Sequence, residues 1–277
     1  TQSRSSAASD VYKRQSEAAP RKRGRPPRVE SPINDQATLS RATIIARAIS
    51  LARETSLDQI SMVQLAKDFG VAPGLIHYYL GGRDKLITGV LNNYYRERLA
   101  RMPALTGNWR ADVEMIARVS LAFAVENPGV STYVASHNRF RLFQDVEPGE
   151  TDFGAAFFNH ATTAFMQGGF SAKQVALAYH LLAQFLVASS RVEAAKQLPI
   201  YHRDFILSRL EAMPAEQYPG ARYVSEAFSS LDTELAFEAG LRILLDGIAS
   251  WAGEPDTAIE AKPKAIAKRK PRASKTA

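Results

Sequence analysis

The side chains of this sequence that could do chemistry are suited to binding rather than to breaking bonds. The 277 residues include 35 Lys and Arg and 10 Tyr, but only five His and no Cys. Without Cys there can be no disulfide, thiolate metal site or thiol catalysis, which favours a reducing compartment. No two His are spaced i, i+4, and the chain has no phosphate-binding Gly loop, H-E-x-x-H motif or Gly-x-Ser-x-Gly turn. We therefore expect no enzyme, no metal site and no cofactor.

The positive charge is gathered in three parts of the chain. Eight Lys and Arg stand against four Asp and Glu in residues 1–36, nine against five in residues 37–101, and seven against two in residues 255–277. Residues 102–254 are acidic, with eleven against seventeen. A polyanion is the expected partner of the basic parts. Taken alone, each count is equally compatible with an ordinary solvated surface.

Both ends of the chain are expected to be disordered basic tails, because they contain few large apolar residues. Residues 1–15 include a stretch that resembles translated adapter sequence. Arg23-Gly24-Arg25-Pro26 resembles the core of an AT-hook. Gly lets the backbone sink into a narrow A·T minor groove, Pro keeps it extended, and the Arg side chains lie along the groove. A generic basic linker is the alternative, and the C-terminal tail is expected to bind phosphates non-specifically.

The elements that must position these side chains are helical. Apolar residues at i, i+3, i+4 spacing predict helices from Ser40 to about residue 52 and at about 61–69, 72–80 and 83–101. Ser61 and Gln64 suggest a capping box, Gly70 ends the second helix, and Pro73 begins the third. Two short helices around a Gly turn indicate a helix-turn-helix, although a plain helical hairpin has the same pattern. Further helices are expected at about 109–126, 129–143, 150–168, 171–196, 201–212 and 225–251.

The run from Ile60 to Leu80, with Arg83-Asp84-Lys85-Leu86 after it, resembles the DNA-binding domain of the TetR family of transcription regulators. The likeness covers about residues 38–95. It implies an all-α fold with a helix-turn-helix domain and connecting helix in residues 37–101 and a helical regulatory and dimerisation domain in residues 102–254. The chain departs from the family pattern at Ala72, Leu75, His77 and Gly81-Gly82, so its operator sequence is not indicated.

The resemblance also implies which residues meet DNA. Tyr78, Tyr79 and Arg83 would hold phosphates, which set the register, while the start of the recognition helix would approach bases, which set specificity. Packing within the helices is the alternative for the two Tyr. The residues expected at DNA are Arg23, Gly24, Arg25, Pro26, Arg41, Met62, Pro73, Gly74, Leu75, His77, Tyr78, Tyr79 and Arg83.

The second half of the chain is expected to hold a ligand pocket between its helices. Residues 140–170 are rich in Phe, and polar side chains nearby are candidate contacts. The candidate ligand-binding residues are His137, Asn138, Phe157, His160, His180 and Gln184. An apolar stripe is expected along the last helix, formed by Phe228, Leu231, Leu235, Leu241, Leu245 and Ile248.

Residues 237–247 resemble the final helix of the Tet-repressor-type C-terminal domain, which implies a homodimer through helices at about 171–196 and 225–251. A purely intramolecular core is the alternative. We expect a ligand-inducible repressor that binds a palindromic operator in double-stranded DNA, in the bacterial cytoplasm on the nucleoid. The alternative is an architectural nucleoid-type protein, suggested by the two basic tails. We expect no membrane partner, because no apolar run approaches the about 20 residues of a spanning helix.

Overall fold

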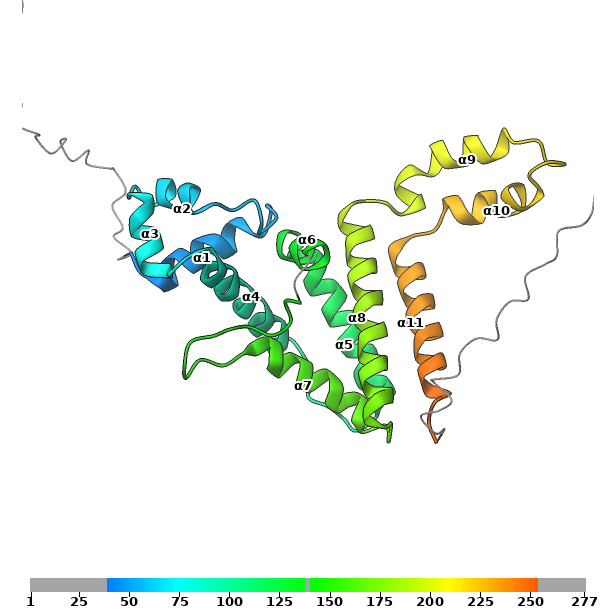
Figure 1. The fold of residues 1–277 in the computed structure, drawn as a ribbon. Coiled ribbons are helices and arrows are strands. Elements are labelled where there is room, and N and C mark those ends of the chain that lie inside the picture. Colours follow the sequence, from blue (N-terminus) through cyan, green and yellow to red (C-terminus); the bar gives the residue numbers. More distant parts are fainter. Residues whose placement is uncertain (1–38, 138–139, 254–277) are drawn as a thin grey trace, which may run out of the picture. The chain divides into compact units, whose positions relative to one another are not determined.

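The computed structural model describes residues 39–137 and 140–253. The AT-hook-like motif at residues 23–26, the C-terminal basic tail and Asn138 lie outside these ranges. Within them every regular element is a helix, so the expected all-α fold is confirmed (Figure 1).

The first four helices begin and end where local signals place them. They are α1 (Arg41–Leu51), α2 (Met62–Asp68), α3 (Pro73–Leu80) and α4 (Arg83–Ala100). Ser40 forms a capping box with Thr43, whereas Ser61 caps α2 by accepting from the N–H of Gln64 without a reciprocal bond among those described. Gly70 and Gly81 take the positive φ angles of 65° and 77° that end α2 and α3.

The three short helices α1–α3, which we call the head, close over one apolar centre. Its buried side chains come from every part of the head and from α4, as a helix-turn-helix requires. They include Ile44, Leu57, Ile60, Leu65, Ile76, Leu80, Leu86 and Leu91. Ala66 at this centre is only 1% exposed, so its small side chain allows α2 and α3 to pack closely. The head is therefore carried on the first half of α4.

The remaining helices form a bundle that packs against the second half of α4. They are α5 (Trp109–Glu126), α6 (Pro128–Ser136), α7 (Phe153–Met166), α8 (Ala172–Ala194), a 3-10 turn η1 (Pro199–His202), α9 (Arg203–Glu211), α10 (Pro219–Ser229) and α11 (Thr233–Ala249). The helices α5, α7 and α8 pack against one another, α4 packs on α7, and α11 lies along α8 (Figure 1). α9 and α10, which follow α8 and precede α11 in the sequence, pack against each other as a hairpin.

Two predicted helices are wrong in extent. The segment 225–251 is two helices, because Asp232 accepts from the N–H of Leu235 and starts a new helix after Ser230. Phe228 and Leu231 therefore lie outside the last helix. The helix predicted at 129–143 ends at Ser136, and His137 is already extended. Residues 140–152 instead pack as an irregular segment whose Leu142 and Gln144 are buried.

One described stretch, Ala172–Glu211, is long and apolar enough to cross a membrane by length and composition alone. Those two properties do not distinguish a spanning helix from a helix inside a bundle. The stretch begins with α8, which packs against α5, α6, α7 and α11. The absence of a membrane partner stays a prediction.

Candidate nucleic-acid interface and ligand cavity

The outer face of α3 carries exposed side chains, while its inner face packs into the head. Ile76 and Leu80 point into the head, while Leu75 is 40% exposed and Tyr78 is 81% exposed. The rings of Tyr78 and Tyr79 meet edge to face, with centroids 5.5 Å apart. His77, Pro73 and Gly74 are also exposed. The predicted DNA-contact residues of α3 thus share one accessible surface, and their contact with DNA stays a prediction.

The start of α3 has no side-chain cap, because Ala72 occupies the N-cap position. Pro73 is at the first turn, and the space around Gly74 is open. Backbone N–H groups at a helix start carry partial positive charge and favour phosphate oxygens. This end of α3 therefore suits a DNA backbone as well as base edges.

Met62, Arg83 and Arg41, which were also predicted to contact DNA, do not lie on the exposed face of α3. The side chain of Met62 is buried, with 7% exposure, because it packs into the head, so this position offers DNA only its backbone. The guanidinium of Arg83 donates to the carbonyls of Ile60 and Asp58, both at 2.6 Å. Arg83 thereby ties the start of α4 to the loop before α2, and its charge is partly engaged within the protein.

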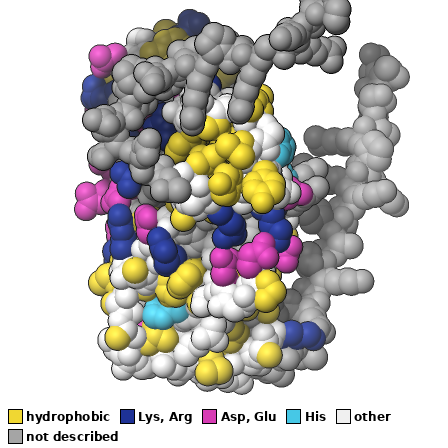
Figure 2. Space-filling model, turned by 90° about the vertical axis from the view of Figure 1, so that its left-hand side faces the viewer, with side chains coloured by type: hydrophobic (Ala, Val, Ile, Leu, Met, Phe, Trp, Pro, Cys, Tyr) yellow, Lys and Arg dark blue, Asp and Glu magenta, His cyan; other side chains and the backbone are white. Residues whose placement is uncertain are grey.

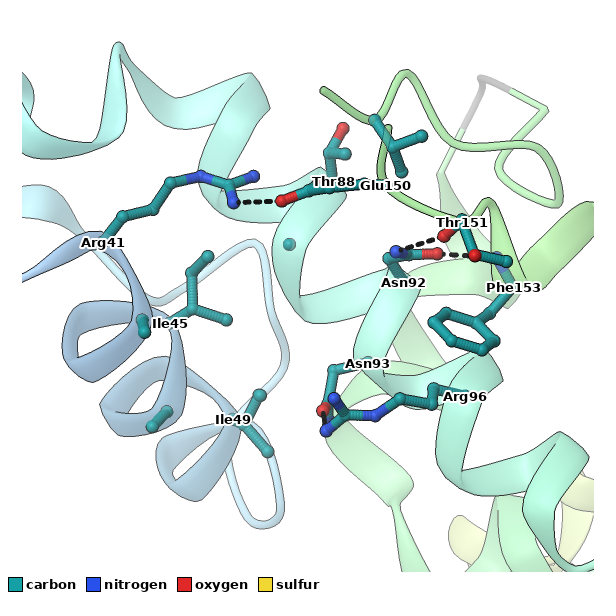
Figure 3. A pocket seen from close by; sticks show the side chains of 14 residues that line it. Arg41, Ile45, Ile49, Thr88, Asn92, Asn93, Arg96, Glu150, Thr151 and Phe153 are labelled. Carbon is teal, nitrogen blue, oxygen red and sulfur yellow. Dashed lines mark hydrogen bonds and ion pairs between the residues drawn. The ribbon is translucent and has the colours of Figure 1, made fainter. Parts of the chain in front are cut away.

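Arg41, the third of these residues, is paired with an acidic segment from the bundle. We call residues 144–152, between α6 and α7, the acidic strap. Nη1 of Arg41 lies 2.9 Å from Oε1 of Glu150 (Figure 3). Nζ of Lys85 lies 3.1 Å from Oε1 of Glu147. The pKa of Lys85 is raised, mainly by its hydrogen bond to Glu147. The strap thus neutralises cations at the base of the head.

The strap is fastened at its far end to α4 and α7. Asn92 on α4 donates to the carbonyl of Thr151 at 2.9 Å and accepts from the N–H of Phe153 at 2.8 Å (Figure 3). Asp152 caps α7 and also accepts from the N–H of Gln144 at 3.0 Å. A groove of about 420 Å³ lies between α1, α4 and the strap.

The side of the molecule on which α1–α3 lie in Figure 1 faces the viewer in Figure 2. A patch of hydrophobic side chains adjoins a mixture of Lys, Arg, Asp and Glu side chains there. On this face the basic charge is therefore partly offset by carboxylates.

A cavity of about 680 Å³ lies among α4, α5, α6, α7 and α8. Of the predicted ligand residues, His137, Phe157 and His180 line it, whereas His160 and Gln184 do not, and Asn138 lies outside the described residues. His160 instead packs near Asp112; burial lowers its pKa, and the Asp112 charge opposes that shift. Gln184 is exposed on a different side of α8.

The cavity also has polar lining residues that sequence reasoning missed. Arg98 lies with its guanidinium carbon 4.0 Å from the ring centre of Phe157, and its Nε donates to Oγ of Ser120 at 3.3 Å. Arg141, Tyr95 and Tyr179 also line the cavity. Tyr94, Tyr95 and Arg98 share one side of α4, because Arg98 follows Tyr95 by three positions and Tyr94 by four. That spacing in the sequence could have predicted that the three residues lie together.

A family profile described as "Tetracyclin repressor-like, C-terminal domain" matches residues 103–251. The HTH-type transcriptional regulator BetI of Brucella anthropi is 35% identical over 82 residues, which are 29% of this chain and 42% of that protein. The HTH-type transcriptional regulator Mb1846 of Mycobacterium bovis is 30% identical over 98 residues, 32% of this chain and 42% of that protein. The chain thus spans less than half the length of these curated relatives.

Solved structures show the same fold. Apo ActR from Streptomyces coelicolor superposes with a TM-score of 0.64 at 21% identity, over 79% of this chain and all 100% of that one. ActR in complex with actinorhodin gives 0.64 at 22% identity, with the same coverage. The profile covers more than half of the 277 residues and the arrangement of the helices agrees with it, so the chain belongs to the tetracycline-repressor-like, or TetR, family of transcription regulators.

Proposed function

We propose that this protein is a ligand-responsive transcriptional repressor that binds a palindromic operator as a homodimer. One observation carries the proposal: the helix that supports the exposed face of α3 is the same helix that lines the cavity. Leu86 and Leu91 of α4 are buried under the head, and Tyr95 and Arg98 of α4 line the cavity. α4 is continuous over 18 residues, or about 27 Å at the usual rise per residue.

A ligand in the cavity would act on the head by favouring one position of α4. Its effect is limited by the difference between its affinities for the two positions. The acidic strap supports a second connection, because it continues from a cavity wall that includes Arg141 and Phe143 and then pairs with Arg41 and Lys85.

Apolar surface left on the outer helices supports the dimer. On α11, Ile243 is 70% exposed and Leu235 is 57% exposed. A large contiguous patch of exposed apolar side chains is typical of an interaction surface. A two-fold dimer would place two copies of α3 about 34–36 Å apart, one turn of DNA. We also propose that the DNA-binding domain ends near residue 101 and that the regulatory and dimerisation domain follows it.

The N-terminal tail would add affinity that α3 does not supply. Its AT-hook-like motif would occupy an adjacent minor groove while the head occupies the major groove. Linking two weak DNA contacts raises the effective concentration of the second. The relatives named as transcription regulators support regulation rather than an architectural role.

The experiment is selection from random double-stranded DNA with the full chain, followed by footprinting and fluorescence anisotropy on the selected site. A short two-fold-symmetric footprint is expected, and sequence-indifferent coverage would overturn the proposal. Tyr78→Phe should weaken binding about tenfold, because it removes a hydrogen bond to a charged phosphate. Tyr223→Phe is the matched control, since Tyr223 is 90% exposed on α10 and should leave DNA binding unchanged.

A further inference from the structure

We infer that the cavity binds a planar aromatic acid, with the acidic group held by Arg98 and Arg141 and the rings held by the Phe side chains of the wall. The inference rests on the proposed function, since it names the chemical class of the effector. It is carried by the charges, donors and rings that the described residues bring to the cavity.

The cavity is lined by two cations, and its described lining contains no carboxylate. Arg98 and Arg141 line it, and no Asp or Glu is among the lining residues in the part of the chain that the structure describes. The polar contacts described for Arg98 are the Ser120 hydroxyl and the face of the Phe157 ring. A partly buried cation without a carboxylate is costly unless an anion enters beside it.

Arg141 has a donor that the protein leaves unused. Its Nε is buried and has no hydrogen-bond partner among residues 39–137 and 140–253. The Asp84 carboxylate is 4.0 Å from its terminal nitrogen, and that Asp side chain is 73% exposed. A buried N–H without an acceptor is destabilising, and an oxygen of the ligand would relieve that cost. A guanidinium is suited to the two oxygens of a carboxylate or sulfonate.

Two hydroxyl groups add neutral donors to the same cavity. Burial raises the pKa of Tyr95 and of Tyr179 above the usual range, and the charge of Arg98 opposes the shift in both. Both hydroxyls therefore stay protonated at neutral pH and sit near Arg98. Protonated hydroxyls can donate to an anionic oxygen, which fits a ligand with an acidic group rather than a basic one.

Aromatic rings form a connected wall. Ring centres are 5.8 Å apart for Phe140 and Phe143, 5.5 Å for Phe143 and Phe158, and 4.8 Å for Phe158 and Tyr179. Phe140 is 75% exposed although it lines the cavity. Such rings gain most from a flat partner that can stack or meet them edge to face. The volume of about 680 Å³ lies within the range of sites for small organic ligands.

The test uses two fluorescent probes with the same ring system. 1-Anilinonaphthalene-8-sulfonate carries a sulfonate, and N-phenyl-1-naphthylamine lacks it, so the ratio of their dissociation constants isolates the anion. The full chain should bind the sulfonate probe at least about tenfold more tightly, the factor expected for a charged hydrogen bond. Equal affinities in the unmodified protein would overturn the inference.

Variants then locate the anion. Arg141→Gln and Arg98→Gln should each bring the two affinities together by weakening only the sulfonate probe. Arg96→Gln, two positions before Arg98 and exposed on α4, is the matched control and should keep the ratio. Arg141→Gln remains decisive if Arg98→Gln fails to fold, because Nε of Arg141 has no hydrogen-bond partner among the described residues and its described ion pair, with the exposed Asp84, is long at 4.0 Å. An unchanged ratio in Arg141→Gln would overturn the assignment.

A cavity-filling variant checks the location. Ala183 lines the cavity on α8, and Ala183→Trp should abolish binding of both probes. Retained binding would place the probes elsewhere and overturn the inference. These titrations contain no DNA, so they test the ligand class independently of the proposed function. A preference for the sulfonate probe can be found even if no operator is selected. An operator can likewise be selected even if the two probes bind equally well.

Discussion

Arg41, the first residue of α1, and Glu150, 109 positions later in the chain, form an ion pair across 2.9 Å between Nη1 and Oε1. The pair sets a carboxylate from the bundle against a cation at the base of the head. A DNA phosphate that approaches Arg41 must compete with Glu150. Intramolecular charge therefore reduces the part of the basic surface that is free for DNA.

The Glu150→Gln variant should bind DNA more tightly. Removal of the carboxylate frees Arg41 to pair with a phosphate, and each added phosphate contact makes the slope of log affinity against log salt steeper by about 0.9. We expect the slope to steepen by nearly one unit and the affinity in low salt to rise several-fold. The measurement is fluorescence anisotropy across a salt series.

Thermal stability should barely change in Glu150→Gln, because an exposed ion pair contributes at most about 1 kcal/mol. Glu216→Gln is the charge-matched control, since Glu216 is exposed in the loop between α9 and α10. If both variants changed the salt slope equally, the effect would come from net charge and the role of the Arg41–Glu150 pair would be wrong.

Gly129 at the start of α6 allows the bundle to approach the head closely. A Cβ there would lie 2.3 Å from the carbonyl oxygens of Ala52 and Thr55, and the carbonyl of Gly129 accepts from the N–H of Leu57 at 3.3 Å. Backbone atoms cannot move aside cheaply. Gly129→Ala should therefore lower the free energy of unfolding by about 1–3 kcal/mol, as overpacking does, when measured by urea denaturation.

Gly220→Ala serves as the control for Gly129→Ala. Gly220 lies in the first turn of α10, and a Cβ there would meet nothing within 4 Å. Ala should raise stability by about 0.5 kcal/mol, because it restricts the unfolded chain. Equal stability of the two variants would show that the junction between α6 and the head is not tightly packed in solution.

Glu193 makes the base of the α9–α10 hairpin sensitive to acid. Its carboxylate accepts from Lys196 at 2.6 Å and from Tyr201 at 2.8 Å, and also from Thr233. These bonds, with that of Lys196 first, lower the pKa of Glu193 to about 2. Because the folded pKa lies below the unfolded value, the carboxylate stabilises the fold above about pH 4 and this contribution is lost as the pH falls toward 2.

The Glu193→Gln variant should be less stable than the parent at pH 7, by about 1–3 kcal/mol, because a neutral amide replaces the buried carboxylate that accepts charge-assisted hydrogen bonds from Lys196, Tyr201 and Thr233. The difference should shrink as the pH falls from about 5 toward 2. The measurement is the urea midpoint of both proteins over that range. Parallel pH profiles would contradict the assigned role of Glu193.

Removal of residues 1–36 tests the N-terminal tail. A chain that begins at Ala37 loses eight Lys and Arg and four Asp and Glu. It should bind DNA more weakly and with a shallower salt dependence, because fewer phosphates are neutralised. Replacement of Arg23 and Arg25 by Gln in the full chain separates the AT-hook-like motif from general charge. Equal salt slopes for full-length and shortened protein would rule out a DNA contact by the tail.

The helices of the head were predictable because residues at or next to their ends determine where they begin and end. Ser40 acts through the cap that its own side chain makes, and Gly70, Pro73 and Gly81 act through their own backbone geometry, so none of these signals needs a tertiary contact. The ends of α6 and α10 were not predictable in this way. Apolar spacing continues past Ser230, and the restart depends on a single cap by Asp232.

The sequence predicted a pocket between the helices of the second half, but it predicted only some of the residues that line the cavity. His137, Phe157 and His180 line it, whereas His160 and Gln184 have the right chemistry on the wrong side of their helices. Arg98 and Arg141 were missed because an Arg in a helical pattern is ordinarily a solvent-facing residue. The irregular segment 140–152 turns Arg141 inward, and only tertiary packing determines that.

The division of α3 into inward and outward residues has an evolutionary consequence. Ile76 and Leu80 hold the head together, while Leu75, His77 and Tyr78 are exposed and contribute little to the packing of the head. Mutations at the exposed positions can therefore accumulate without much loss of stability. A duplicated copy of such a gene can acquire a new target on DNA while it keeps the sensing half unchanged, so the two specificities can evolve independently.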